Sequence, residues 1–129
     1  MATICLTTAL SRHELTDTIP RTIDIALPQG TWLPKLSAPV TWHKFARATF
    51  GIGRGTLPID GHRIGIYDAQ RSIIDTFRLR HQEGHELAVE ALKRWLGKRG
   101  SHPSALLAMA RRVDPRSEVS IRKTLEILL

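Results

Sequence analysis

The sequence has few of the residues that build secreted or membrane proteins. It contains a single cysteine, Cys5, in 129 residues, so an intrachain disulfide is excluded. No uncharged apolar run approaches the roughly 20 residues that cross a bilayer. Residues 1–10 also lack the positively charged region that opens a signal peptide. We therefore expect a cytoplasmic protein without a targeting segment or a membrane contact.

Acidic residues are also scarce. The chain has 12 Asp and Glu against 19 Lys and Arg, which gives a net charge of +7. A positive surface suits an acidic partner such as nucleic acid, an acidic protein face or a nucleotide. Because the acidic residues are interspersed among the basic ones, the same charge also fits a surface that only confers solubility. The charge by itself does not name the partner.

The length and the hydrophobic fraction of 42% predict one soluble domain over residues 1–129, with its own core. Residues 4–15 carry a loose helical stripe that ends at Pro20. Alternation of apolar and polar residues then predicts strands at 21–27 and 40–45. Residues 49–58 are glycine-rich and indicate a flexible loop, and Asp60-Gly61 is typical of the turn of a following hairpin.

The second half has a helical pattern throughout. Asp68 is a plausible N-cap for a helix that ends near Gly84, and a second helix covers residues 86–96. Ser101 and Pro103 indicate the start of a third helix, and Asp114-Pro115 separates it from a fourth. The predicted fold class is α+β: a small, mostly antiparallel sheet in the first half, packed against about four C-terminal helices.

The sequence contains no complete motif for metal binding or phosphate binding. His81 and His85 lie at i, i+4, but Gly84 interrupts the helix between them, so they indicate two exposed histidines around a turn between helices. Three alternate glycines at 51, 53 and 55 precede Leu57-Pro58 instead of the Lys-Ser/Thr that opens a phosphate-binding helix. We expect neither a metal nor a cofactor.

No catalytic constellation emerges either. Cys5 has no nearby histidine to activate it and is better interpreted as a small buried apolar residue. Asp60 suits a turn, Asp68 a helix cap, and Asp75 an ion pair with Arg71 or Arg78. We therefore expect a binding protein and not an enzyme, while a hydrolase or nuclease that uses Asp60, Asp68 or Asp75 is the minor alternative.

The remaining signal is the basic character of the helical half. Two interpretations compete, an arginine surface that contacts phosphates and a set of solvated helix exteriors. Residues 86–112 also fit a helix-turn-helix, but the second helix has only Ser104 to reach base edges before it turns apolar. The candidate nucleic-acid or partner-binding residues are Arg71, Arg78, Arg80, Lys93, Arg94, Lys98, Arg99, Arg111 and Arg112.

Several segments together resemble a known family. They are residues 5–17 (CLTTALSRHELTD), 25–30 (IALPQG), 42–43 (WH), 66–75 (IYDAQRSIID), 77–81 (FRLRH), 91–96 (ALKRWL) and 105–110 (ALLAMA). In this order they are similar to the C-terminal domain of AbiEi-family antitoxins. The likeness covers nearly the whole chain, and no single motif in it carries catalytic chemistry.

The resemblance implies an α+β domain that supports neutralisation of an AbiEii-type nucleotidyltransferase toxin. Family members also have an N-terminal winged helix-turn-helix that reads the promoter of their operon, and this sequence begins at the second domain. The resemblance therefore implies that the basic helices either contact DNA as an auxiliary surface or meet an acidic region of a toxin or of another antitoxin copy. The alternative function is a DNA-binding transcriptional regulator that acts through the basic helical face.

Overall fold

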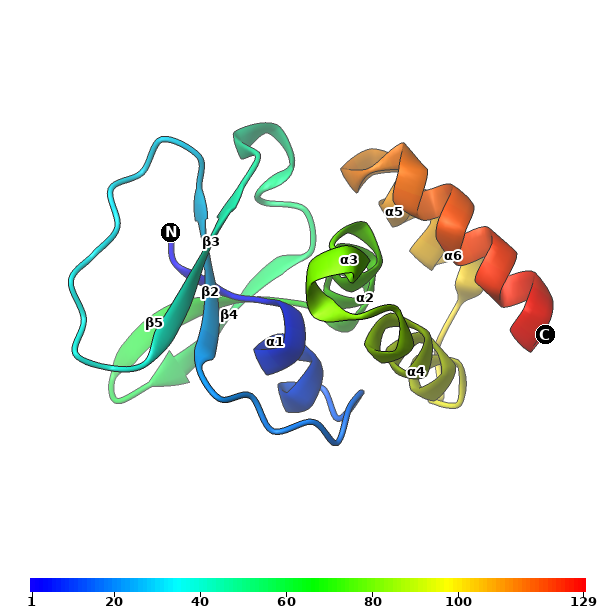
Figure 1. The fold of residues 1–129 in the computed structure, drawn as a ribbon, viewed down its shortest axis with the longest axis horizontal. Coiled ribbons are helices and arrows are strands. Elements are labelled where there is room, and N and C mark those ends of the chain that lie inside the picture. The colour runs from blue at the N-terminus through cyan, green and yellow to red at the C-terminus, as the bar shows by residue number, and fades with distance from the viewer.

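The computed structural model describes residues 1–129 as a sheet followed by a group of helices (Figure 1). The sheet lies at one side of the molecule, helices α1 and α2 lie beside it, and α4, α5 and α6 lie beyond α2 (Figure 1). Strands come from the first half of the chain and most helices from the second, which confirms the α+β class. None of the helices combines the length and the apolar character that a membrane span requires.

The sheet has five strands in the order β3-β2-β1-β5-β4. Their bounds are Thr3–Ile4 for β1, Ile23–Pro28 for β2, Val40–Phe45 for β3, Arg54–Ile59 for β4 and His62–Tyr67 for β5. The β1·β2 and β4·β5 pairs are antiparallel, whereas β1·β5 and β2·β3 are parallel. The sheet is therefore mixed, and the prediction of a mostly antiparallel sheet was wrong. Residues 29–39 return along the sheet before β3 starts, so β3 runs in the direction of β2.

Two strands lie where the sequence predicted other structure. β1 is only two residues long, too short for an alternating pattern, yet it is the middle strand of the sheet and precedes α1 (Leu6–Arg12). β4 occupies part of the segment predicted as a glycine-rich loop. The turn of the β4–β5 hairpin is confirmed, because Asp60 and Gly61 both have positive φ, as a type I′ turn requires.

The helices follow the predicted order with one break. The helix predicted from Asp68 to near Gly84 divides into α2 (Ala69–Arg78) and the one-turn α3 (Arg80–Glu83). The others are α4 (His85–Leu96), α5 (Pro103–Val113) and α6 (Pro115–Leu128). The Asp68 cap is confirmed, since its Oδ1 accepts a hydrogen bond from the Arg71 N–H at 2.7 Å. Ser101 does not cap α5, because His102 holds that position.

The largest core cluster surrounds α2. Ile73, Ile74 and Phe77 of α2 pack with apolar residues from α1, α4, α5 and α6. A second cluster is built by residues of β2, β3, β5 and the start of α1, and it includes Cys5 and Tyr67. Cys5 is fully buried, which confirms its interpretation as a small apolar core residue, and burial raises the pKa of its thiol. Helix α2 thus joins the sheet to the other helices.

A buried ion pair fixes α2 to the loop before β4. The Arg71 side chain is 1% exposed and that of Asp75 is 0% exposed, and Arg71 Nε donates to both Asp75 oxygens at 3.0 and 3.1 Å. Arg71 also donates from a terminal nitrogen to the carbonyl oxygens of Thr49 and Ile52, at 2.7 and 2.8 Å. Its guanidinium carbon lies 4.4 Å from the centre of the Tyr67 ring. Every polar contact of this arginine is therefore internal.

Asp75 accepts hydrogen bonds from a second arginine. Arg78 donates to Asp75 Oδ1 from Nε and from a terminal nitrogen, at 3.2 and 3.0 Å. Burial raises the pKa of Asp75 above its ordinary value, and the two guanidinium groups oppose this rise. The predicted ion pair of Asp75 with Arg71 or Arg78 is confirmed with both partners at once. Removal of the Asp75 carboxylate would leave the buried Arg71 cation without an opposite charge.

We expect Asp75→Ala to lower the free energy of unfolding by about 3–5 kcal/mol, because it leaves the Arg71 charge buried and unpaired. Urea unfolding followed by circular dichroism measures this loss. The matched control is Glu90→Ala, which removes an exposed carboxylate that pairs with Arg94 at 3.1 Å. An exposed pair contributes little, so equal losses for the two variants would contradict the structural importance of Asp75.

Candidate functional site

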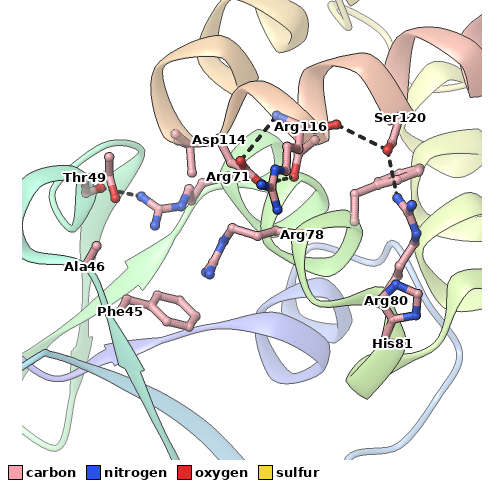
Figure 2. A pocket seen from close by; sticks show the side chains of 13 residues that line it. Phe45, Ala46, Thr49, Arg71, Arg78, Arg80, His81, Asp114, Arg116 and Ser120 are labelled. Carbon is pink, nitrogen blue, oxygen red and sulfur yellow. Dashed lines mark hydrogen bonds between the residues drawn. The ribbon is translucent and has the colours of Figure 1, made fainter.

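A cleft of about 560 Å³ lies between the end of β3 and the helices α2, α3 and α6 (Figure 2). One wall comes from Phe45 and from the short 3-10 helix η1 (Arg47–Thr49) that follows β3. The opposite wall is the first turn and a half of α6, which begins at the Asp114-Pro115 boundary. Segments that are distant in the sequence thus form one depression at the junction of the sheet and the helices.

Basic side chains from two helices and the α3 turn line this cleft. Arg78 comes from the end of α2, Arg80 and His81 from α3, and Arg116 from the start of α6 (Figure 2). Arg78 lies with its guanidinium carbon 4.6 Å from the centre of the Phe45 ring, and its pairing with Asp75 is already satisfied. Its position over an aromatic face leaves the guanidinium at the edge of the cleft.

Arg80 and Arg116 carry the uncompensated charge of the cleft. Arg80 donates to the Ser120 hydroxyl at 2.8 Å and forms no ion pair. The Arg116 guanidinium likewise has no carboxylate within 4.0 Å. Both guanidinium groups therefore keep donors that an anion can use.

The single carboxylate in the lining, Asp114, is occupied by the start of α6. One of its oxygens accepts from the Arg116 N–H at 3.3 Å, and the other accepts from the Ser117 hydroxyl at 2.8 Å. These bonds cap the helix and direct the carboxylate toward its first turn. The charge of Asp114 does not pair with a side-chain cation. The cleft is therefore positive, with hydroxyl groups between the arginines.

This arrangement is suited to binding an anion. Guanidinium groups bind phosphate or carboxylate oxygens through paired N–H donors, and converging arginines recognise such groups by shape as well as by charge. The Ser117 hydroxyl donates to the Asp114 carboxylate, and the Ser120 hydroxyl donates to the Arg116 carbonyl and accepts from Arg80. The cleft therefore offers cationic and hydroxyl contacts to an anion.

The structure does not gather the predicted site residues on one face. Arg71 was predicted as an exposed contact, and this was wrong, because the Asp75 carboxylate and two backbone carbonyls bury it. Arg78 and Arg80 do meet in the cleft. Arg111 and Arg112 are exposed at the end of α5, and Arg111 pairs with Glu118 at 3.1 Å. Of the candidates, Arg71, Arg78 and Arg80 line the cleft, and Arg71 is fully buried.

The remaining candidates lie at the end of α4, away from the cleft. Arg94 pairs with Asp17 at 2.6 Å and with Glu90, and Lys98 lies 4.0 Å from Glu14. The hydrogen bond from Arg94 lowers the pKa of the Asp17 carboxyl. Lys93 and Arg99 are exposed and form no ion pair. The ion pair between Glu90 and Arg94 reduces the positive charge of this end.

Arg116, Phe45 and His81 line the cleft but were not among the predicted contacts. Arg116 belongs to the basic helical half, but its sequence neighbours do not show that α6 begins opposite α3. Phe45 was expected only as part of a strand. His81 was interpreted as an exposed histidine beside a turn, which is confirmed, since Gly84 ends α3 with a positive φ of 112°. The sequence signal that could have identified Arg116 is its position in the first turn of a helix that Asp114 caps.

No protein-family model matches the sequence, and no curated protein matches it either. The geometry of the cleft and the distribution of charge are therefore the observations that bear on function.

Inorganic phosphate is expected to raise the melting temperature of the protein more than sodium chloride of the same ionic strength, because an anion bound to the folded state stabilises it. We expect the double variant Arg80→Ala/Arg116→Ala to lose this increment in a thermal-shift titration. The matched control is Lys93→Ala/Arg99→Ala, which removes two exposed, unpaired cations away from the cleft. An unchanged phosphate increment in the cleft variant would exclude anion binding there.

Proposed function

We propose that this chain is an interaction domain of an antitoxin, which supports neutralisation of an AbiEii-type nucleotidyltransferase toxin through the basic cleft. The observation that carries the proposal is the pair of cleft arginines without carboxylate partners, Arg80 and Arg116. Cations held in a depression without compensating carboxylates favour an acidic binding partner. The sequence elements that build the cleft supply the second line of support.

Part of the cleft lies in the segments that resemble AbiEi antitoxins, whereas Arg116 and the α6 wall lie outside them. Residues 77–81 supply Arg78, Arg80 and His81 to the cleft. Residues 66–75 supply Arg71 and Asp75, which hold the neighbouring wall against α2. A resemblance confined to core positions would support the fold alone. Here the similar segments also contain charged groups that face the cleft, which supports a shared binding role.

The arginine chemistry fits neutralisation better than catalysis. A nucleotidyltransferase handles phosphate groups with acidic side chains and metal ions at its site, so the surface around such a site is a natural partner for a positive cleft. Electrostatic complementarity of this kind raises the rate of encounter and selects the orientation of the partners. Phe45 beside Arg78 adds an apolar patch to the same depression.

Co-expression with an AbiEii-type toxin tests the proposal. We expect the wild-type chain to relieve the growth arrest and the charge reversal Arg80→Glu/Arg116→Glu to abolish the relief, because it turns attraction in the cleft into repulsion. Lys93→Glu/Arg99→Glu makes the same change in net charge elsewhere and should still protect. Failure of the wild-type chain to protect, or full protection by the cleft variant, would exclude this function for the cleft.

A second candidate function is DNA binding by the basic exterior, as in a transcriptional regulator. The specific observation in its favour is that no acidic residue lies between Asp24 and Asp60, while this stretch contains Lys35, Lys44, Arg47 and Arg54. Together with Lys93, Arg99 and Arg112 these residues provide cations without carboxylate partners. Such residues make sequence-independent contacts with phosphates.

Duplex DNA binding measured over a range of salt concentrations separates this candidate from the first. If the basic exterior contacts the phosphates, the affinity falls linearly with salt on a double logarithmic scale. Arg47→Ala should then reduce the slope by about one unit. Glu86→Gln, which removes an exposed negative charge, is the matched control and should not reduce it. Absence of binding at low salt would remove this candidate.

A further inference from the structure

A second depression adjoins the arginine cleft at the open edge of the sheet. This side hollow has a volume of about 260 Å³ and lies between the 41–45 stretch of β3 and three residues around the end of α2, Arg78, Leu79 and Gln82. It shares Phe45 and Arg78 with the cleft. The two depressions therefore meet at these two residues, and one ligand of suitable length can occupy both.

The two depressions differ in chemistry. The cleft carries the guanidinium groups of Arg80 and Arg116, which have no carboxylate partner. The side hollow instead contains the Thr41 hydroxyl and the Gln82 amide, and both residues are exposed. An amide presents a donor and an acceptor together, which is the pairing that the polar edge of a nucleobase requires. The combination suits a ligand with an anionic group at one end and a polar ring at the other.

The backbone of β3 adds further donors and acceptors to the side hollow. Ile23 N–H donates to the Pro39 carbonyl and Gln29 N–H donates to the Phe45 carbonyl, so the odd-numbered residues of this segment point their backbone groups toward β2. The backbone groups of Trp42 and Lys44 then point the other way, and β3 has no neighbour on that side. These N–H and C=O groups are available to a ligand in the hollow.

Arg78 is the residue around which the two depressions meet, and it is held in place. Its guanidinium donates twice to Asp75 Oδ1 and lies 4.6 Å from the centre of the Phe45 ring (Figure 2). The side chain nevertheless stays 25% exposed. A guanidinium plane stacks on aromatic rings, including nucleobases. A base in the side hollow can therefore stack on Arg78 without first ordering it.

The charge of the cleft matches a phosphate group better than a carboxylate. Arg80 and Arg116 supply two positive charges, whereas the charge of Arg78 is already shared with Asp75. A phosphate monoester carries about −1.5 to −2 at pH 7 and offers three acceptor oxygens. A single carboxylate would leave one of the two guanidinium groups unmatched. The Ser120 hydroxyl also holds Arg80 at 2.8 Å, so this donor is preorganised.

The side hollow distinguishes a nucleotide from other phosphate-bearing partners. A DNA duplex keeps its bases stacked, so it can contact the arginines but cannot place a base beside Arg78. A phosphopeptide could pair with the edge of β3, yet a paired strand extends along the whole edge. The volume of the hollow fits one ring. A nucleoside phosphate is the ligand that uses the arginines, the amide and the free backbone groups together.

We propose that the cleft and the side hollow together bind a nucleoside phosphate. The phosphate lies between Arg80 and Arg116, and the base lies in the side hollow against Arg78 and Gln82. This inference goes beyond the proposed function, because it assigns a small ligand to the site. A bound nucleotide and an acidic protein surface would then compete for the same arginines.

Calorimetric titration of the purified chain at constant ionic strength tests the proposal. The probes are the four common nucleoside 5′-monophosphates, ribose 5-phosphate, adenosine and inorganic phosphate. We expect at least one nucleotide to bind about tenfold or more tightly than ribose 5-phosphate and inorganic phosphate, because a stacked base adds to the phosphate contact. Adenosine, which lacks the phosphate, should bind more weakly than any of the nucleotides.

Two variants separate the base contact from the phosphate contact. Gln82→Trp places a large ring in the side hollow and should reduce nucleotide affinity to that of inorganic phosphate, while inorganic phosphate binds as before. Arg80→Ala/Arg116→Ala should lose both ligands. Ala108→Trp adds the same ring at an exposed position of α5 that lines neither depression, and it should bind the nucleotide like the wild type. Melting temperatures establish that each variant is folded.

A 5′-phosphorylated trinucleotide distinguishes two sources of the same group. If it binds more tightly than the mononucleotides, the natural ligand is the end of a nucleic-acid strand; if it binds more weakly, the ligand is a free nucleotide. Both results support the proposal. The proposal is overturned if no nucleotide exceeds inorganic phosphate, if Gln82→Trp leaves nucleotide affinity unchanged, or if a phosphoserine peptide binds more tightly than every nucleotide.

These measurements do not involve the toxin, so they are independent of the antitoxin function. A chain that relieves growth arrest but binds nucleotides no better than inorganic phosphate would overturn this inference alone. A chain that binds a nucleotide but gives no relief would overturn the proposed function and leave the nucleotide site intact.

Discussion

The ion pair between Arg71 and Asp75 connects the two halves of the molecule. Arg71 belongs to α2, yet two of its hydrogen bonds reach the backbone that follows β3, at Thr49 and Ile52. A buried cation and anion each lose hydration, and only close pairing with additional hydrogen bonds compensates for that loss. Here the compensation comes from carbonyl groups and a second arginine. Helix, loop and sheet are thereby held in one relative position.

The cleft is a consequence of this arrangement. Arg71 holds the Thr49 wall, and the same Asp75 that binds Arg71 also draws Arg78 across the ring of Phe45. The break of the helix at Leu79 then turns Arg80 toward α6, where Ser120 receives it. A continuous helix would place Arg78 and Arg80 on different sides. The interrupted helix therefore decides which arginines share the cleft.

The positive charge of the chain is distributed unevenly between paired and unpaired groups. At the end of α4 and along α6, basic side chains meet carboxylates and form surface pairs. In the cleft Arg80 and Arg116 have no such partners, and the same holds for Lys35, Lys44 and Arg47 in and after the loop between β2 and β3. Exposed pairs contribute little to stability, but they do reduce the local potential. The places that still attract an anion are thus fewer than the count of basic residues indicates.

The sequence determined the local features that depend on near neighbours. The α+β class, the hairpin turn at Asp60-Gly61, the Asp68 cap and the partners of Asp75 all follow from residues within a few positions of one another. Only the tertiary structure decided that two-residue β1 is the central strand, that the sheet is mixed, that Arg71 is buried and that Arg116 faces Arg80. The physical reason is that periodicity reports which face of an element is apolar. It does not report what packs on that face, and burial or exposure of an arginine depends on chain segments far away in the sequence.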